Sequence, residues 1–323
     1  MLIMKNWKVR YSYLPQQFKK IDHIITRVKN VVQKGDFTLG RELTIFEKRF
    51  ASLIGTKYAV GVNSGTDAIK ISLKAIGVKH GDEVITAANT FVATVGGICE
   101  LGAKPVFVDV KENYCLDADL LEAKINKKTK AILPVHFTGY TPDMKKIMAI
   151  SKKYKIPVIE DACQGILSSF NKKNSGTWGI TGCFSLHPLK NLNVWSDGGI
   201  ITTNNKKIYQ KLKLLRNHGL INRDEFTING YNSRLDTIQA AVGNCLINDV
   251  KILTKKRIKN ANYYDKEFSK IKQLSIPKRY KENKNVFHLY VIFAKKRNQL
   301  LKYCLKKGIE CKIHYPKELY LKK

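Results

Sequence analysis

The feature that most constrains the fold is a regular alternation of short apolar segments with segments of helical periodicity between residues 58 and 161. Each apolar segment ends in small or polar residues, and apolar residues then recur at the spacing of one helix face. Strands that alternate with helices in this way indicate an α/β fold, in which a mostly parallel sheet is covered by helices on both faces. Ligands of such sheets bind beyond the carboxyl ends of the strands. The expected strands are 58–62, 84–86, 105–109, 131–135 and 157–161, and the expected helices begin near residues 68, 91, 116 and 143.

Further patterns flank this region and predict a second, smaller domain. We expect a large domain over residues 1–248 and a smaller α+β domain over residues 249–323. Outside the alternating region, helices are expected up to Gly35, over 43–53, over 207–216, from about 236 to about 268 and over 298–307, and strands are expected at 286–294 and 310–314.

Lys190 lies in an unusual polar frame within the stretch CFSLHPLKNLNVWSDGGIITT, residues 183–203. An apolar run at 183–186 reads as a strand, and Asp197-Gly198-Gly199 turns the chain into a second strand. A lysine in a loop between such strands can be partly desolvated, which lowers its proton affinity and makes it an amine nucleophile suited to a Schiff base. Because Lys and Arg total 58 residues, a solvated surface lysine is the simpler reading of Lys190 taken alone.

Two polar positions follow strands of the predicted sheet. Gly65 and Thr66 lie where a strand passes into a helix, and backbone N–H groups at a helix start with a neighbouring hydroxyl suit a phosphate. Asp161 ends the apolar run of IPVIEDACQG, where a carboxylate needs a cationic partner or hydrogen bonds. A helix N-cap without a ligand is the alternative reading of both positions.

The net charge of +32 raises the alternative of a nucleic-acid-binding protein. The lysines are spread along the whole chain instead of forming one basic segment, so we expect no nucleic-acid partner, and such a surface would also attract phosphates and dicarboxylates. The seven cysteines show no C-x-x-C spacing, which predicts reduced thiols and neither a disulfide framework nor a metal site. The chain has no long apolar run and no apolar signal segment near its start, so a cytoplasmic protein without a membrane partner is expected.

Taken together, these segments resemble the DegT/DnrJ/EryC1/StrS family of sugar aminotransferases, pyridoxal-phosphate enzymes with an aspartate-aminotransferase-like fold. The resemblance covers nearly the whole chain and rests on the order and spacing of its motifs. They are NSGTDAI (63–69), GDEVIT (81–86), TFVAT (90–94), GAKPVFVDV (102–110), AILPVHFTGY (131–140), VIEDACQG (158–165), CFSLHPLKN (183–191), DGG (197–199), RNHG (216–219), GYNSRLDTIQAAVG (230–243) and HYP (314–316).

The resemblance implies a role for each matching residue on the cofactor. Lys190 would form the Schiff base with pyridoxal 5′-phosphate and later move the proton between the substrate carbon and the cofactor. Asp161 would pair with the pyridinium nitrogen, Gln164 would bond the phenolic oxygen, and Phe91 would stack on the ring. Gly65, Thr66 and Ser185 would hold the phosphate.

Further residues are implied for the second subunit and for the substrate. Asn232 would reach the phosphate from the partner of a homodimer with shared active sites, and Arg234, His314 and Tyr315 would contact substrate. His187 and His218 lie near the site by motif and are interpreted as structural.

The sequence also departs from the family pattern. Cys163 stands where the family usually has a small residue, and we interpret it as core packing. The chain ends at Lys323, soon after HYP, so the small domain is expected to be incomplete, with apolar strand faces left uncovered.

The expected reaction is amino transfer from glutamate, or glutamine, to a keto carbon of a nucleotide-linked deoxy-ketosugar, in amino-sugar biosynthesis for surface polysaccharides or glycosylated products. The segment Asn232-Ser233-Arg234 is more similar to members that act at sugar C3 than to those that act at C4. One alternative is a sugar dehydratase of the same family, but these enzymes carry histidine at the position of Lys190. The other alternative is a non-catalytic basic binding protein on the same fold.

Overall fold

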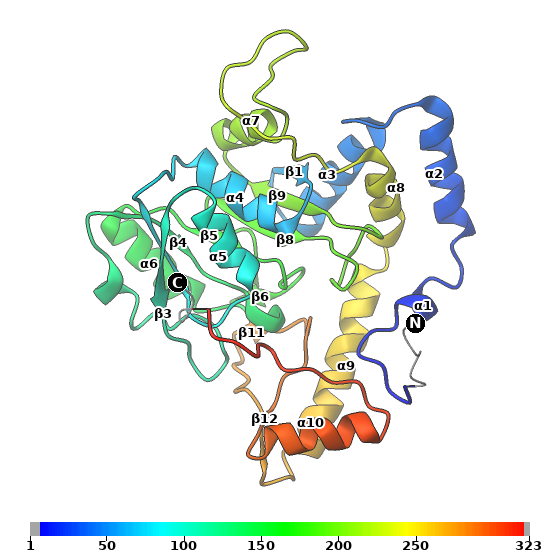
Figure 1. Cartoon of the computed structure of the whole chain (residues 1–323), viewed down its shortest axis with the longest axis vertical. Helices are drawn as coiled ribbons and strands as arrows, with labels where there is room; N and C mark the ends of the chain where they lie inside the picture. The colour runs from blue at the N-terminus through cyan, green and yellow to red at the C-terminus, as the bar shows by residue number, and fades with distance from the viewer. Residues whose placement is uncertain (1–6, 320–323) are drawn as a thin grey trace.

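The computed structural model describes residues 7–319, which are organised around a central, mostly parallel sheet (Figure 1). A four-stranded part has the order β1 (Tyr58–Val62), β9 (Gly199–Thr203), β8 (Thr181–Ser185), β5 (Ile159–Asp161), and a three-stranded part has the order β3 (Lys104–Val108), β2 (Glu83–Ala87), β4 (Thr129–Leu133). Parallel bridges from Ile132 to Val158 and from Val135 to Asp161 join the two parts. Among the strand pairs of this central sheet, those that β9 forms with β1 and β8 are antiparallel and the others are parallel, so the mixed α/β architecture expected from the sequence is confirmed.

Helices cover both faces of this sheet because successive residues of each strand point to opposite sides. Cys183 and Ile201 belong to a core that includes residues of α4 (Gly65–Ala75) and α7 (Lys206–Leu215), whereas Phe184 and Ile200 belong to a core with residues of α3 (Arg41–Ile54) and α8 (Thr237–Leu246). The other helices of the large region are α1 (Leu14–Gln17), α2 (Asp22–Lys34), α5 (Val92–Cys99), α6 (Met144–Tyr154), and the 3-10 turns η1 (Glu122–Lys124) and η2 (Phe137–Gly139).

Two expected helices differ from the structure. No α-helix begins near residue 116, because the backbone folds into a tight hairpin in which Lys111 N bonds Cys115 O and Asp117 N bonds Asp109 O. The single helix expected over about 236–268 is two helices, α8 and α9 (Val250–Phe268), with a turn between them. The turn is closed by a hydrogen bond from Asp249 N to Leu246 O at 3.1 Å, and Ile247 and Val250 on either side of it are buried in the same core.

The remainder of the chain contains short strands and one helix. These are β10 (Leu274–Ser275), β11 (Asn283–Lys284), β12 (Phe293–Ala294) and α10 (Arg297–Lys306), while β11 pairs with β6 (Ser169–Phe170), which pairs with β7 (Lys173–Asn174). The strands expected over the whole of 286–294 and at 310–314 are therefore wrong. The backbone groups of 286–289 are used in contacts with Thr138 and Gly139 of the large region instead. The division into domains at residue 248 stays a prediction.

The first and last described segments of the chain lie side by side. Lys8 N and Val9 N both donate to Gly308 O, and Glu310 N donates to Val9 O. Tyr11 N donates to the Glu310 carboxylate at 3.0 Å. The segment that follows Glu310 is therefore held by residues from the opposite end of the sequence. Within residues 7–319, no helix is both long enough and apolar enough to cross a membrane.

Candidate active site

Lys190 lies in the loop between β8 and β9, as the sequence predicts. Its backbone N–H donates to His187 O at 2.8 Å, and the side chain of the next residue, Asn191, donates to Val286 O at 3.3 Å. Burial lowers the pKa of Lys190 below its ordinary value, and the nearby Asp161 carboxylate acts in the opposite direction. The amine is therefore easier to deprotonate than a surface lysine, which is what a nucleophilic lysine requires.

Asp161 is the last residue of β5, and its carboxylate is buried with an exposed fraction of 4%. Thr94 Oγ1 donates to Oδ2 at 2.7 Å, and Cys163 N donates to Oδ1 at 3.2 Å. None of the salt bridges within residues 7–319 includes this carboxylate. A buried carboxylate with hydrogen bonds but no ion-paired cation is suited to a cationic ligand such as a pyridinium.

The start of α4 forms a tight cradle beside the end of β8. A Cβ added at Gly65 would lie 2.7 Å from Ser185 Cβ and 3.0 Å from Cys163 Sγ, so only glycine fits this close approach. Ser64 caps the helix by accepting from Asp67 N at 3.0 Å. The N-cap interpretation of this loop thus applies to Ser64, while the N–H groups at Gly65 and Thr66 lie in the first turn, where they have no intrahelical partner and can bind an anion.

Gln164, Tyr315 and Phe91 lie close together. Thr138 N donates to Gln164 Oε1 at 2.6 Å, which fixes the amide so that Nε2 donates to the Tyr315 hydroxyl at 3.3 Å. The Phe91 ring is 49% exposed and its centroid lies 5.7 Å from that of Tyr315. Burial raises the pKa of Tyr315 to about 12, so this residue is a neutral phenol at physiological pH.

His314 contacts the first segment of the chain. Its Nε2 atom and the Tyr11 hydroxyl lie 3.2 Å apart, and the two rings are stacked. Burial, followed by the charge of Lys312, lowers the pKa of His314, which favours a neutral imidazole.

Asn232 and Arg234 contact each other instead of the other predicted site residues. Arg234 Nε donates to Asn232 Oδ1 at 3.0 Å, and Arg234 Nη2 lies 3.2 Å from His218 Nε2. Asn232 is exposed. Within residues 7–319, neither side chain forms a hydrogen bond with Lys190 or Asp161, so the hydrogen bonds of the single chain do not join these residues to the site.

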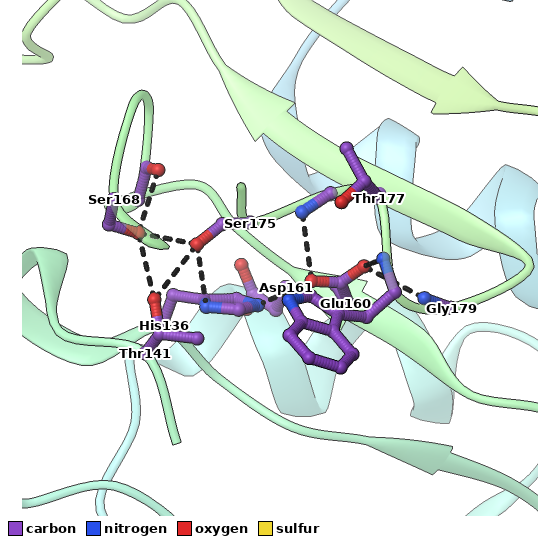
Figure 2. A network of polar contacts seen from close by, with 12 residues as sticks. His136, Thr141, Glu160, Asp161, Ser168, Ser175, Thr177 and Gly179 are labelled. Atoms are coloured by element: carbon purple, nitrogen blue, oxygen red, sulfur yellow. Dashed lines mark hydrogen bonds and ion pairs between the residues drawn. The ribbon is translucent and has the colours of Figure 1, made fainter. Parts of the chain in front are cut away.

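A buried polar network lies behind Asp161 (Figure 2). Because Glu160 precedes Asp161 in β5, its side chain points to the opposite face of the sheet. Glu160 accepts hydrogen bonds from the backbone of Gly176, Trp178 and Gly179 at 2.8, 2.7 and 2.9 Å. His136 Nε2 lies 3.0 Å from Glu160 Oε2, and His136 N donates to Asp161 O at 2.9 Å. The network holds the strand end that carries Asp161.

Two further residues of this region, Thr94 and His288, are not among the site residues predicted from the sequence. Thr94 lies four residues after Thr90, and their hydroxyls are 2.7 Å apart, so the helical spacing of the two threonines was a signal that could have been used. His288 lies in a segment that the sequence pattern assigns to a strand, and nothing in that pattern indicates that its Nδ1 atom is buried.

The arrangement fits pyridoxal 5′-phosphate. It combines a lysine with lowered pKa, a buried carboxylate without an ion-paired cation, a helix start that a single Cβ would block, and an exposed aromatic ring. An α/β sheet with these groups beyond its strand ends defines the class of pyridoxal-phosphate enzymes with an aspartate-aminotransferase-like fold.

Comparison with known proteins identifies the family. Residues 19–323 match the DegT/DnrJ/EryC1/StrS aminotransferase family. The chain is 38% identical to the UDP-2-acetamido-2-deoxy-3-oxo-D-glucuronate aminotransferase of Pseudomonas aeruginosa, over 93% of this chain and 84% of the relative. It is 36% identical to the UDP-N-acetyl-3-dehydro-alpha-D-glucosamine 3-aminotransferase of Acidithiobacillus ferrooxidans, over 91% and 80%.

Solved structures give the same result. Streptomyces venezuelae DesV in complex with a ketimine intermediate matches with a TM-score of 0.95 at 30% identity, over 97% of this chain and 85% of that chain. Bacillus subtilis NtdA with bound cofactor PMP matches with a TM-score of 0.90 at 31% identity, over 98% and 74%. The chain belongs to the DegT/DnrJ/EryC1/StrS aminotransferase family. It is an aminotransferase, and its cofactor is pyridoxal 5′-phosphate.

Proposed function

We propose that this enzyme transfers an amino group from glutamate, or glutamine, to the C3 keto carbon of a nucleotide-linked sugar. The observation that carries this proposal is the lysine with lowered pKa beside the buried Asp161, since amino transfer needs a nucleophilic amine next to an electron-accepting ring. The names of the two sugar aminotransferases above, both of which specify a 3-oxo or 3-dehydro sugar, support the C3 position.

Each residue has a task that follows from its surroundings. When bound, the cofactor supplies an electron sink for the negative charge that develops at the substrate carbon. Lys190 takes the proton from that carbon and returns it, and its lowered pKa suits this because a base must be unprotonated before it can accept a proton. Asp161 holds the ring nitrogen in its protonated form through its charge. Gln164, fixed by Thr138 N, orients the phenolic side of the ring.

The same proposal assigns the phosphate to the start of α4. N–H groups of the first helical turn and the hydroxyls of Thr66 and Ser185 bind the phosphate, and the helix dipole adds to this attraction. His314 and Tyr315 lie on the substrate side, where both are neutral and can exchange hydrogen bonds with sugar hydroxyls.

We also propose that the active unit is a homodimer whose sites combine two chains. The side chains of Asn232 and Arg234 bond each other and His218 instead of Lys190 or Asp161, and α8, which follows them, has the small residues Ala240, Ala241 and Gly243. A two-fold arrangement would place the loop of each chain in the site of the other.

Visible spectroscopy and a substrate panel test the reaction. The purified protein with cofactor is expected to show the absorption of a lysine-linked pyridoxal phosphate, and Lys190→Ala is expected to bind the cofactor without this band. Nucleotide-linked 3-keto and 4-keto sugars are then offered with glutamate or glutamine. Faster amination of 4-keto sugars would contradict the C3 assignment, and a fully active Lys190→Ala enzyme would contradict the mechanism.

Subunit mixing tests the shared site. Inactive Lys190→Ala and inactive Asn232→Ala proteins are mixed under conditions that exchange subunits. With random pairing, half of the dimers are mixed and each mixed dimer has one intact site, so roughly a quarter of the wild-type activity should return. No recovery after demonstrated exchange would place both residues in the site of one chain.

A salt-dependent shift of DNA mobility without the cofactor absorption would favour the basic binding protein.

A further inference from the structure

The three residues around Asn232 are held in an extended conformation by the end of α7. Tyr231 N donates to Leu215 O at 2.7 Å, and Asn232 takes part in an antiparallel bridge. Ser233 N donates to Arg216 O at 3.0 Å. Successive side chains of an extended segment point to opposite sides. Asn232 is accordingly exposed, whereas Ser233 is 1% exposed and Tyr231 is half-buried.

Ser233 fixes this segment to the first turn of α4 in its own chain. Its Oγ atom donates to Asp67 Oδ2 at 2.7 Å and accepts from Asn63 N at 3.3 Å. Asp67 lies in the first turn of the helix whose N–H groups are assigned to the cofactor phosphate. The buried hydroxyl has both a donor and an acceptor contact, which fixes its orientation.

Tyr231 contacts the next turn of the same helix. Lys70 Nζ lies 4.7 Å from the centroid of the Tyr231 ring, a distance at which a cation is attracted to an aromatic face. The same ammonium group pairs with Asp67 Oδ1 at 2.9 Å. We call the contacts of Ser233 with Asp67 and of Tyr231 with Lys70 the clamp. Because the clamp holds both neighbours of Asn232, the backbone of Asn232 is fixed and its side chain points away from α4.

We propose that Ser233 is a positioning residue that presents Asn232 to the active site of the partner subunit. This role rests on the proposed function, in which Asn232 reaches the cofactor phosphate of the other chain. Ser233 touches neither the cofactor nor the substrate and acts through Asn232. A flexible segment would lose conformational entropy when it binds the phosphate, whereas a clamped segment has lost that entropy on folding. The first two turns of α4 therefore serve both sites of the dimer.

Titration with pyridoxal phosphate tests the proposal without any sugar, so an error in the proposed substrate does not affect the result. The absorption of the lysine-linked cofactor is followed in Ser233→Ala protein. The loss of a hydrogen bond to a charged group should weaken cofactor binding about tenfold. Ser151→Ala is the matched control. It removes another buried serine hydroxyl, which donates to Ile156 O at 2.6 Å, and should bind the cofactor like the wild type.

Subunit mixing then shows in which site the loss occurs. Ser233→Ala protein is mixed in equal amounts with Lys190→Ala protein, and exchange is verified by native mass spectrometry. Only chains with Lys190 give the absorption. With random pairing about half of these chains have a Lys190→Ala partner, whose intact Ser233 serves their site. About half of the absorption should therefore titrate with the wild-type affinity and the rest about tenfold more weakly.

A role within the same chain gives a different titration. If Ser233 supported only the phosphate site of its own chain, the whole absorption would titrate with the weak affinity in the mixture. This result, or unchanged binding by Ser233→Ala protein alone, would overturn the proposal. Tyr231→Leu removes the other contact of the clamp and is used if Ser233→Ala protein does not fold. It should give the same two phases, and a single weak phase would count equally against the clamp.

An Asn232→Ala mixture separates this proposal from the proposed function. Mixed with Lys190→Ala protein, Asn232→Ala protein should show the same two phases. Two phases here and one weak phase with Ser233→Ala would refute the clamp and leave the shared site intact. A single weak phase with Asn232→Ala would refute the shared site itself, and with it the role of Ser233.

Discussion

Thr94→Val should weaken the site because it removes the hydroxyl donor of a buried carboxylate. Thr94 is 1% exposed and donates to Asp161 Oδ2 at 2.7 Å, while Asp161 keeps only the N–H of Cys163 at 3.2 Å. Valine has nearly the same shape, so the cavity term is small. A hydrogen bond to a charged group contributes about 1.5–3 kcal/mol, and the free energy of unfolding should fall by about this amount at pH 7.

Urea denaturation of the cofactor-free protein measures this change, with Thr94→Ser as the matched control. Serine keeps the hydroxyl and loses one methyl group, which costs about 0.8 kcal/mol. The affinity for pyridoxal phosphate should fall with Thr94→Val as well, because a carboxylate with one donor fewer is less well oriented.

A double-mutant cycle with Asp161→Asn tests the reason for the effect. In the asparagine background the hydrogen bond is between neutral groups, so the cost of valine should fall to about 0.5–1.5 kcal/mol. The hydroxyl of Thr90 loses its partner in both backgrounds, so this contribution cancels. An equal cost of valine in both backgrounds would refute the argument that Thr94 stabilises the charge of Asp161.

Three further predictions concern the cofactor site. Burial lowers the pKa of Lys190 in the folded protein below the value of 10.5 in the unfolded chain. Between these two pKa values the unfolded chain binds more protons than the folded protein, so the free energy of unfolding rises with pH. Cofactor-free Lys190→Met should therefore resist urea better than the wild type at pH 7, and this difference in stability should shrink toward about pH 10. A margin that grows with pH would contradict this. Gly65→Ala places a Cβ 2.7 Å from Ser185 Cβ and should weaken pyridoxal phosphate binding at least roughly tenfold, which corresponds to about 1.4 kcal/mol. Fluorescence titration measures this affinity. Gly96→Ala is the control and should leave the affinity unchanged, because the space around its Cβ is open. Asp161→Asn should lower kcat and cofactor retention, and unchanged turnover would mean that the acid is only structural.

The sequence predicts the central sheet because its strands carry a strong local pattern. Apolar runs that stop at small or polar residues predict strands at 58–62 and 105–109 and a strand that ends at Asp161. In the structure β1 and β3 agree with the first two ranges within one residue at each end, and β5 ends at Asp161. The loop position of Lys190 follows in the same way, from two apolar runs separated by Pro188 and a glycine turn.

The errors lie where the backbone finds partners far away in the sequence. Residues 286–294 have the composition of a strand, but Val286 and Leu289 donate to Gly139 and Thr138, which no local pattern reveals. The positions of Thr94 and His288 depend in the same way on Asp161 and Arg257, which lie 67 and 31 residues away in the sequence, respectively. Local periodicity therefore predicts the elements, whereas the partners of single side chains depend on how the elements pack.

The contact between the two ends of the described chain affects how the protein can be handled. Val9 pairs with Ile309, and Tyr11 contacts both Glu310 and His314. The first residues of the described structure therefore help to hold the C-terminal segment that carries His314, a proposed substrate contact. Trimming the chain to residue 12, or attaching a bulky fusion partner close before Lys8, would leave the central sheet intact but would release this segment. Affinity tags and surface immobilisation through the N-terminus would then change the apparent sugar preference of an enzyme whose cofactor absorption looks normal.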